Sequence, residues 1–234
     1  QPLIIQVGFK TLFDQARIPG SEYIGPGADG TGLGMLRKRL ASLKKDTFIV
    51  LYHEAFHQYI HYSTGELPPH TWFNEGTGDY FSGAQLKDGK LRGIGPNPWR
   101  VQTIQQNVAE EKFIPWEEMI RYEQPQYYQP DKVHLCYAQG WSMIYFLRKS
   151  DEVAKKPEWA KILPTYFDTL KASYAEELAK LTDAQREDAG IRGGAGLTAR
   201  NKALEAAFQG VDLTELQNAW KKFTLAIEDP RKKK

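Results

Sequence analysis

Cysteine is nearly absent from this chain of 234 residues, since Cys136 is its only one, and no disulfide can form within the chain. No apolar run reaches 18 residues, which predicts no membrane span. The net charge is only +2, and the one basic block is the terminal stretch 231–234. This stretch is typical of a solvated tail, so we expect no nucleic-acid partner.

The chain begins with Gln1 and shows no signal peptide. A first residue other than Met suggests a processed protein or an excised domain, and we expect an extracytoplasmic location, secreted or periplasmic. Cys136 falls on the apolar face of a helix expected over residues 132–149. It is interpreted as a packed core thiol rather than a nucleophile, because it lies on this apolar face and His134, two positions away, points to a different side of the helix.

Composition is otherwise ordinary for a globular protein, with 41% hydrophobic and 26% charged residues. The length suffices for one domain with a real core. We therefore predict a single α+β domain, mostly α-helical, over residues 1–234. It would comprise a small strand and loop part (1–46), a core (47–150) and a helical lobe (151–234). The composition leaves the oligomeric state open.

The most informative segment contains His53, Glu54 and His57 in an H-E-x-x-H pattern. Residues 47–62 lack Gly and Pro, carry apolar residues around the histidines, and follow Asp46 as a plausible N-cap, so they are predicted to form a helix that ends near Gly65. Two histidines at i and i+4 lie on one face of a helix, as metal ligands do. Glu54 between them is placed to act on a metal-activated water.

A second segment, residues 68–83, is also predicted to be helical. It contains Glu75 and Asp79, again at i and i+4 on one face. Glu75 would be a third metal ligand, and Asp79 would accept a hydrogen bond from the far nitrogen of a ligating histidine. Gly76 and Gly78 weaken a helix but would let it approach the first helix closely. Three protein ligands with one open position are typical of a catalytic zinc site.

The remaining elements follow from periodicity and from turn residues. Strand 3–9 and an amphipathic helix at 33–44 are expected before the motif. After it we predict a polar loop (84–98), helices at 99–111, 115–122 and 132–149, and a loop at 124–130 whose two tyrosines would line a groove or pack on the scaffold. The last third is predicted to be helical, continuing over 172–189, with a glycine-rich break at 190–196 and a last helix opened by Asp212.

These motifs resemble those of the gluzincin metallopeptidases, in which H-E-x-x-H is followed by a glutamate and then by an acid four residues later. The chain is most similar to bacterial peptidase-MA-like domains first catalogued as domains of unknown function. They share a "YHE-x-x-HQ … W-x-x-EG-x-x-x-Y" core, here 52–58 and 72–80, and a later "Y-A-Q-x-W-S-x-x-x-F-L" helix, here 137–147. The resemblance covers roughly residues 47–150 and implies a zincin-like catalytic core.

The resemblance implies one zinc ion held by His53, His57 and Glu75, with Glu54 as general base and Asp79 orienting His53. It implies a zinc metallopeptidase that cleaves peptide bonds in a peptide or protein substrate. Gluzincins also have a downstream Tyr or His that stabilises the oxyanion. The candidates here are Tyr137, favoured by the Y-A-Q-x-W pattern, and His134; a plain core role for Tyr137 stays open.

Two departures limit what the resemblance implies. The loop from His57 to Glu75 is shorter than in well-known gluzincins, and no G-x-M-E-N element that anchors a free amino terminus is present. The alternative is a binding module that keeps the metal site but has little or no catalytic activity. A purely structural helix pair with fortuitous histidines is a further alternative.

Overall fold

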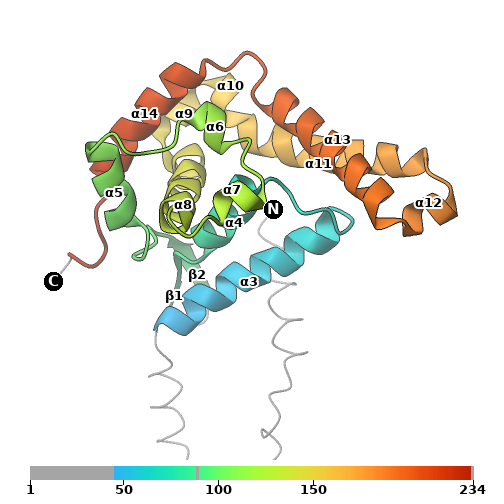
Figure 1. The fold of residues 1–234 in the computed structure, drawn as a ribbon. Coiled ribbons are helices and arrows are strands. Elements are labelled where there is room, and N and C mark those ends of the chain that lie inside the picture. Colours follow the sequence, from blue (N-terminus) through green and yellow to red (C-terminus); the bar gives the residue numbers. More distant parts are fainter. Residues whose placement is uncertain (1–44, 88–89, 233–234) are drawn as a thin grey trace, which may run out of the picture. The chain divides into compact units, whose positions relative to one another are not determined.

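The computed structural model describes residues 45–87 and 90–232 (Figure 1). The chain divides into two compact units, Gln1–Leu51 and Tyr52–Lys234, and the boundary falls inside the first described helix. Of the first unit only the opening turns of that helix are described, with Ile49 buried and Val50 exposed. The strand expected at 3–9 and the helix expected at 33–44 lie outside the described residues.

The described part of the chain is mostly helical with a small sheet, which confirms the predicted mostly helical α+β class. Its elements, labelled as in Figure 1, are α3 (Lys45–Ser63), α4 (Thr71–Phe81), β1 (Ala84–Lys87), β2 (Lys90–Ile94), α5 (Val101–Ala109), α6 (Trp116–Met119), α7 (Gln124–Tyr127), α8 (Val133–Lys149), α9 (Asp151–Lys155), α10 (Pro157–Ala160), α11 (Ile162–Ala179), α12 (Asp183–Glu187), α13 (Ala189–Ala207) and α14 (Leu213–Ala226).

Helix α8 lies at the centre of the core and packs against α4, α5 and α14. Its residues Cys136, Trp141 and Ile144 are fully buried, as the apolar stripe of this helix predicts. Cys136 is a free thiol in this core. Helix α4 is buried along most of its length against α8, which fixes the helix that carries Glu75 and Asp79.

Helices α11 and α13 lie side by side, with α12 between them in the chain (Figure 1). The predicted break at residues 190–196 is wrong, because these glycines lie within α13. The helix begins there because the Asp188 side chain accepts a hydrogen bond from the Ile191 amide, a strong N-cap, and α13 then packs against α11. The continuous helix expected over 172–189 ends instead at Ala179 and restarts at α12.

Three further predictions differ from the structure. The expected polar loop 84–98 contains an antiparallel hairpin, β1–β2, with an irregular register between Gln85 and Leu86. The expected loop 124–130 opens with one helical turn, α7. Helix α3 begins at Lys45, so Asp46 lies inside it and is not its N-cap; its predicted end near Gly65 is confirmed by the positive φ of that residue.

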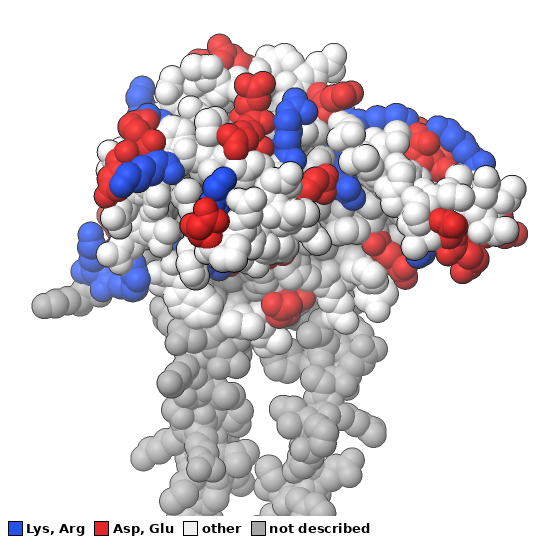
Figure 2. Space-filling view, viewed as in Figure 1, with Lys and Arg blue, Asp and Glu red and all other residues white. Residues whose placement is uncertain are grey.

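The last helix, α14, is opened as predicted by Asp212, which is its N-cap and whose side chain accepts hydrogen bonds from the Thr214 and Glu215 amides. Among the described residues, no helix combines the length and the apolar character needed to cross a bilayer. Acidic and basic side chains are intermixed over the face shown in Figure 2, without a wide field of one sign. The absence of a nucleic-acid partner stays a prediction.

Candidate metal centre

His53 and His57 lie on adjacent turns of α3 and face the same side, as their spacing predicts. Their ring centroids are 4.6 Å apart and the rings are nearly perpendicular. The two Nε2 atoms face each other at 2.9 Å. Both side chains are partly buried. Phe56, next to His57 on α3, packs against Phe81 of α4 with ring centroids 5.7 Å apart.

Glu75 brings a third donor atom to this point from α4. Its Oε2 lies 3.1 Å from Nε2 of His53 and 3.5 Å from Nε2 of His57. His53, His57 and Glu75 are the group in the described part of the chain that can hold a metal ion. Ligand atoms about 2.0–2.1 Å from a tetrahedral zinc lie about 3.4 Å from one another. The three observed separations, 2.9, 3.1 and 3.5 Å, are close to this value.

The far nitrogens of both rings show where the ring protons belong. Nδ1 of His53 lies 3.2 Å from Oδ1 of Asp79, and Nδ1 of His57 lies 3.1 Å from Oδ1 of Asn74. With each Nδ1 donating to its oxygen, each neutral imidazole would present a lone pair on Nε2. Two lone pairs and a carboxylate oxygen would then converge on one point, which favours a positive charge there, either a metal ion or, without one, a proton on His53. These residues fit a divalent metal ion.

The electrostatics of the centre lead to the same conclusion. Burial alone would lower the pKa of His53, but hydrogen bonds with Asp79 and Glu75 raise it to about 9. Burial alone would raise the pKa of Glu75, but hydrogen bonds with His53 and His57 hold it well below its usual range. The site thus attracts a cation and keeps its carboxylate ionised.

Asp79 is itself held by a cation. It is 2% exposed and accepts from Arg100 through Nε, at 2.6 Å to Oδ2, and through Nη2, at 3.3 Å to Oδ1. A buried carboxylate needs such a partner, because removing it from water without compensation is costly. Arg100 thus compensates the charge of Asp79, whose Oδ1 also lies 3.2 Å from Nδ1 of His53.

Two glycines of α4 set its distance from neighbouring elements. A Cβ atom on Gly78 would lie 2.9 Å from Nδ1 of His53, so glycine leaves room for the ring, as the prediction of close approach to the first helix requires. A Cβ on Gly76 would instead lie 2.4 Å from the carbonyl oxygen of Gly140. The close approach at Gly76 is therefore to α8, not to α3.

Two tyrosines lie beside Glu75. The hydroxyl of Tyr128 donates to Oε1 of Glu75 at 2.7 Å, and the Tyr137 ring centroid lies 6.2 Å from that of Tyr128 and 6.4 Å from that of His53. Burial first, and then the Glu75 charge, raise the pKa of Tyr137 to about 12, so its hydroxyl keeps its proton near neutral pH. Tyr137 therefore offers a donor at the edge of the centre.

The other two predicted site residues are placed differently. Glu54 follows His53 on α3 and its side chain is exposed. Viewed along the helix axis, the positions of Glu54 and His57 are about 60° apart. His134 is exposed on the first turn of α8. Within residues 45–87 and 90–232, no hydrogen bond, ion pair or ring contact joins His134 to the three ligands. Of the two oxyanion candidates, Tyr137 is the one near the centre.

Three residues of this centre were not identified from the sequence. Asn74 is adjacent to Glu75 and is the third residue of the W-x-N-E-G element, which is the signal that would have found it. Tyr128 was noted only as a possible groove residue. Arg100 carries no local signal, because it reaches Asp79 from a different element, 21 residues along the chain.

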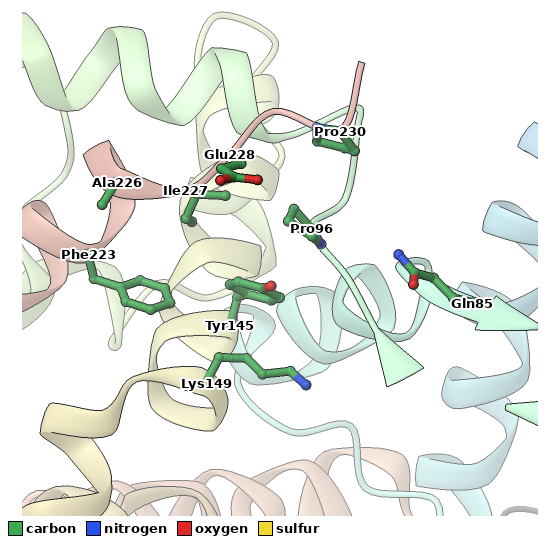
Figure 3. Close-up of a pocket in the computed structure, with 9 residues that line it drawn as sticks. All are labelled: Gln85, Pro96, Tyr145, Lys149, Phe223, Ala226, Ile227, Glu228 and Pro230. Atoms are coloured by element: carbon green, nitrogen blue, oxygen red, sulfur yellow. The ribbon is translucent and has the colours of Figure 1, made fainter. Parts of the chain in front are cut away.

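A pocket in the described part of the chain lies away from the three ligands. It has a volume of about 530 Å³ and is bounded by the hairpin, the end of α8 and the C-terminal segment. Figure 3 shows Tyr145 and Lys149 of α8 on one wall and Phe223 and Ile227 on another. It shares no residue with the metal centre, which is instead a partly open point beside α3.

Fold and site together define a mostly helical domain with a candidate His-His-Glu metal centre. The family model described as "Protein of unknown function (DUF1570)" matches residues 48–165, about half of the chain, and the chain belongs to this family. The matched stretch includes all three candidate ligands, Asp79, Arg100 and both tyrosines. No curated protein and no solved structure matches the chain.

Proposed function

We propose that this protein is a zinc-dependent hydrolase that cleaves peptide bonds, with the zincin-like core that its motifs resemble. The convergence of Nε2 of His53, Nε2 of His57 and Oε2 of Glu75, with both Nδ1 atoms already bonded to oxygens, carries this proposal. Two histidines and a glutamate are a known ligand set of catalytic zinc, which leaves a fourth position for water and substrate. The family match, whose description states no function, leaves this proposal to experiment.

Zinc bound there would lower the pKa of a water molecule to about 7 and polarise a carbonyl group. The residues of the chain then have separate tasks. Asp79 and Asn74 orient the imidazoles of His53 and His57 through Nδ1. Glu54 takes the proton from the attacking water on its carboxylate and later delivers it to the leaving amine.

Tyr137 would complete this set by donating from its hydroxyl to the oxygen of the scissile carbonyl as negative charge develops there. Its raised pKa supports this role, because a protonated phenol can donate near neutral pH. Such a donor typically lowers the activation barrier by about 3 kcal/mol. His134 is exposed and, among the described residues, makes no contact with the three ligands, so its position favours it less for the role.

Metal content gives the first test. Protein purified without chelator should contain close to one zinc per chain by elemental analysis, and mild acid should remove it because the ligands must be deprotonated histidines. His57→Ala should lose the metal, whereas His61→Ala, on the same helix but exposed and outside the centre, should keep it. Wild-type protein without zinc would overturn the proposal.

A second test separates catalysis from binding. Glu54→Gln should retain zinc and lose hydrolysis by about 10²–10⁴-fold, measured by mass spectrometry on mixed peptide libraries. Glu176→Gln, an exposed glutamate on α11, is the matched control and should leave cleavage unchanged. Zinc-loaded wild type that cleaves no peptide in the library would instead favour the binding module.

A further inference from the structure

Arg100 forms a forked ion pair with Asp79 in a mostly buried position. The side chain of Arg100 is 18% exposed and that of Asp79 is 3% exposed. Nε and Nη2 of the guanidinium reach different oxygens of the carboxylate, at 2.6 and 3.3 Å. A two-point contact of this kind fixes the plane of the carboxylate, which a single bond would leave free to rotate.

The fixed plane matters because Oδ1 of Asp79 also faces the histidine. It lies 3.2 Å from Nδ1 of His53 and 3.3 Å from Nη2 of Arg100. The direction of the His53 ring is therefore set by a carboxylate whose own direction is set by Arg100. His57 differs, because its Nδ1 faces the neutral amide oxygen of Asn74.

The backbone before α5 delivers Arg100 to this place. Asn97 is fully buried, and its Nδ2 donates to the backbone carbonyl of Asp79 at 3.1 Å. Its own backbone carbonyl accepts from the amide of Arg100 at 3.1 Å. The turn that follows the hairpin is thus bound to Asp79 at two points, through its carbonyl by Asn97 and through its carboxylate by Arg100.

The same guanidinium also contacts Tyr137. Its Cζ lies 4.7 Å from the Tyr137 ring centroid, a distance typical of a cation–π contact. The ring of Tyr137 lies in turn beside that of His53. One side chain from outside the motif therefore contacts both Asp79, which lies beside a candidate ligand, and Tyr137, whose ring lies beside His53.

We propose that Arg100 is a positioning residue of the metal centre: it holds His53 in the direction needed for metal binding, through Asp79, and it holds Tyr137 beside it. This inference rests on the metal site of the proposed function. It does not require that the site hydrolyse anything, because its main consequence is for zinc affinity.

The test is the zinc dissociation constant, measured by competition with a chromophoric chelator. Arg100→Gln should weaken zinc binding about tenfold, the lower end of the effect usual for residues behind a metal ligand. The matched control is Arg231→Gln. Arg231 makes the same forked contact with Asp229, at 3.1 and 2.9 Å, and touches none of the site residues, so its loss should leave zinc affinity unchanged.

Two further variants decide whether Arg100 acts through Asp79. Arg100→Lys keeps the charge and the aliphatic stem but loses the fork, so its zinc affinity should fall between wild type and Arg100→Gln; it also serves if Arg100→Gln fails to fold. In an Asp79→Asn background, Arg100→Gln should cause little further loss. An equal loss in both backgrounds, or wild-type affinity in Arg100→Gln and Arg100→Lys, would overturn the inference.

These outcomes are separate from those that test hydrolysis. Zinc-loaded wild type that cleaves no peptide, together with weakened zinc binding in Arg100→Gln, would support Arg100 as a positioning residue while rejecting the hydrolase. Full zinc affinity in Arg100→Gln with peptide cleavage intact would reject Arg100 as a positioning residue while supporting the hydrolase.

Discussion

Helices α4 and α13 both contain glycines, but in different surroundings. In α4, a Cβ on Gly76 would lie 2.4 Å from the carbonyl oxygen of Gly140, and one on Gly78 would lie 2.9 Å from the ring of His53. In α13, a Cβ on Gly193 or Gly194 would meet nothing within 4 Å. Each glycine in a helix interior costs about 1 kcal/mol relative to alanine. In α4 this cost is offset by close packing that larger residues would prevent; at these two positions of α13 no such contact offsets it.

The difference extends to what surrounds the two helices. Glu75 and Asp79 place buried carboxylates on α4, each with polar partners, whereas the buried residues of α13 have no polar side chain. A polar interior tolerates less displacement than an apolar one, because each displaced group loses a specific partner. Substitutions in α4 should therefore affect both stability and metal binding, and those in α13 stability alone.

The largest effect is expected for Gly76→Ala. The added methyl group would strike the backbone of α8, which cannot move as a side chain can, so α4 and α8 must separate. Overpacking of this kind typically costs 1–3 kcal/mol, and we expect about 3 kcal/mol in the free energy of unfolding, measured with urea on zinc-free protein. A loss below about 1 kcal/mol would show that the α4–α8 contact is looser than its geometry indicates.

The stability of the protein should also depend on pH, through the residue that precedes α4. His70, the residue before α4, is 2% exposed, and its Nδ1 accepts from the Tyr166 hydroxyl at 2.9 Å. Burial, followed by repulsion from Arg200 of α13 and from Arg121, lowers the pKa of His70 from 6.5 to about 4. The folded protein therefore keeps this ring neutral under conditions where the unfolded chain protonates it.

The direction of the pH effect on stability follows from this difference in the pKa of His70 between the folded and the unfolded chain. Above pH 6.5 both states are neutral at His70 and it adds no pH dependence. As pH falls from 6.5 toward 4, the unfolded chain takes up a proton that the folded state does not, and stability falls by about 1.4 kcal/mol per pH unit, or about 3 kcal/mol in all. His70→Asn retains an acceptor for Tyr166, so the stability difference between wild type and this variant should shrink by about this amount from pH 7 to pH 4. A difference that does not change with pH would contradict the prediction.

Gly78→Ala should have a smaller effect, mainly on the metal. The methyl group meets the side chain of His53, which can shift, rather than backbone. A shifted ring loses its alignment with Asp79, and we expect zinc binding about tenfold weaker, which corresponds to about 1.4 kcal/mol. Competition with a chelator measures it. Unchanged zinc affinity would mean that His53 has more freedom than its contacts indicate.

The smallest effect is expected for Gly193→Ala, and its sign is opposite. The position is exposed, the helix accepts a Cβ there without contact, and alanine reduces the conformational entropy of the unfolded chain. We expect a gain of roughly 0.5–1 kcal/mol in the free energy of unfolding, with zinc affinity unchanged. A loss of stability would show that α13 needs flexibility at this point.

Prediction from the sequence succeeded where the determining contacts are local. The helix that carries His53 and His57, the helical α4 segment, and the start of α14 at Asp212 all follow from spacing and capping within a few residues. It failed at the hairpin and at residues 190–196. Glycine normally marks a break, but in α13 the Asp188 cap and the packing against α11 outweigh that weak local preference.

The same distinction holds inside the metal centre. The sequence alone determined which residues share a helix face, so His53 with His57 and Glu75 with Asp79 were paired correctly, because helical periodicity is a property of the local backbone. Only the tertiary structure decided that Arg100 holds Asp79 and that Tyr128 reaches Glu75, since these bonds join residues 21 and 53 positions apart. Such contacts depend on how separate elements pack, and no short-range pattern encodes that.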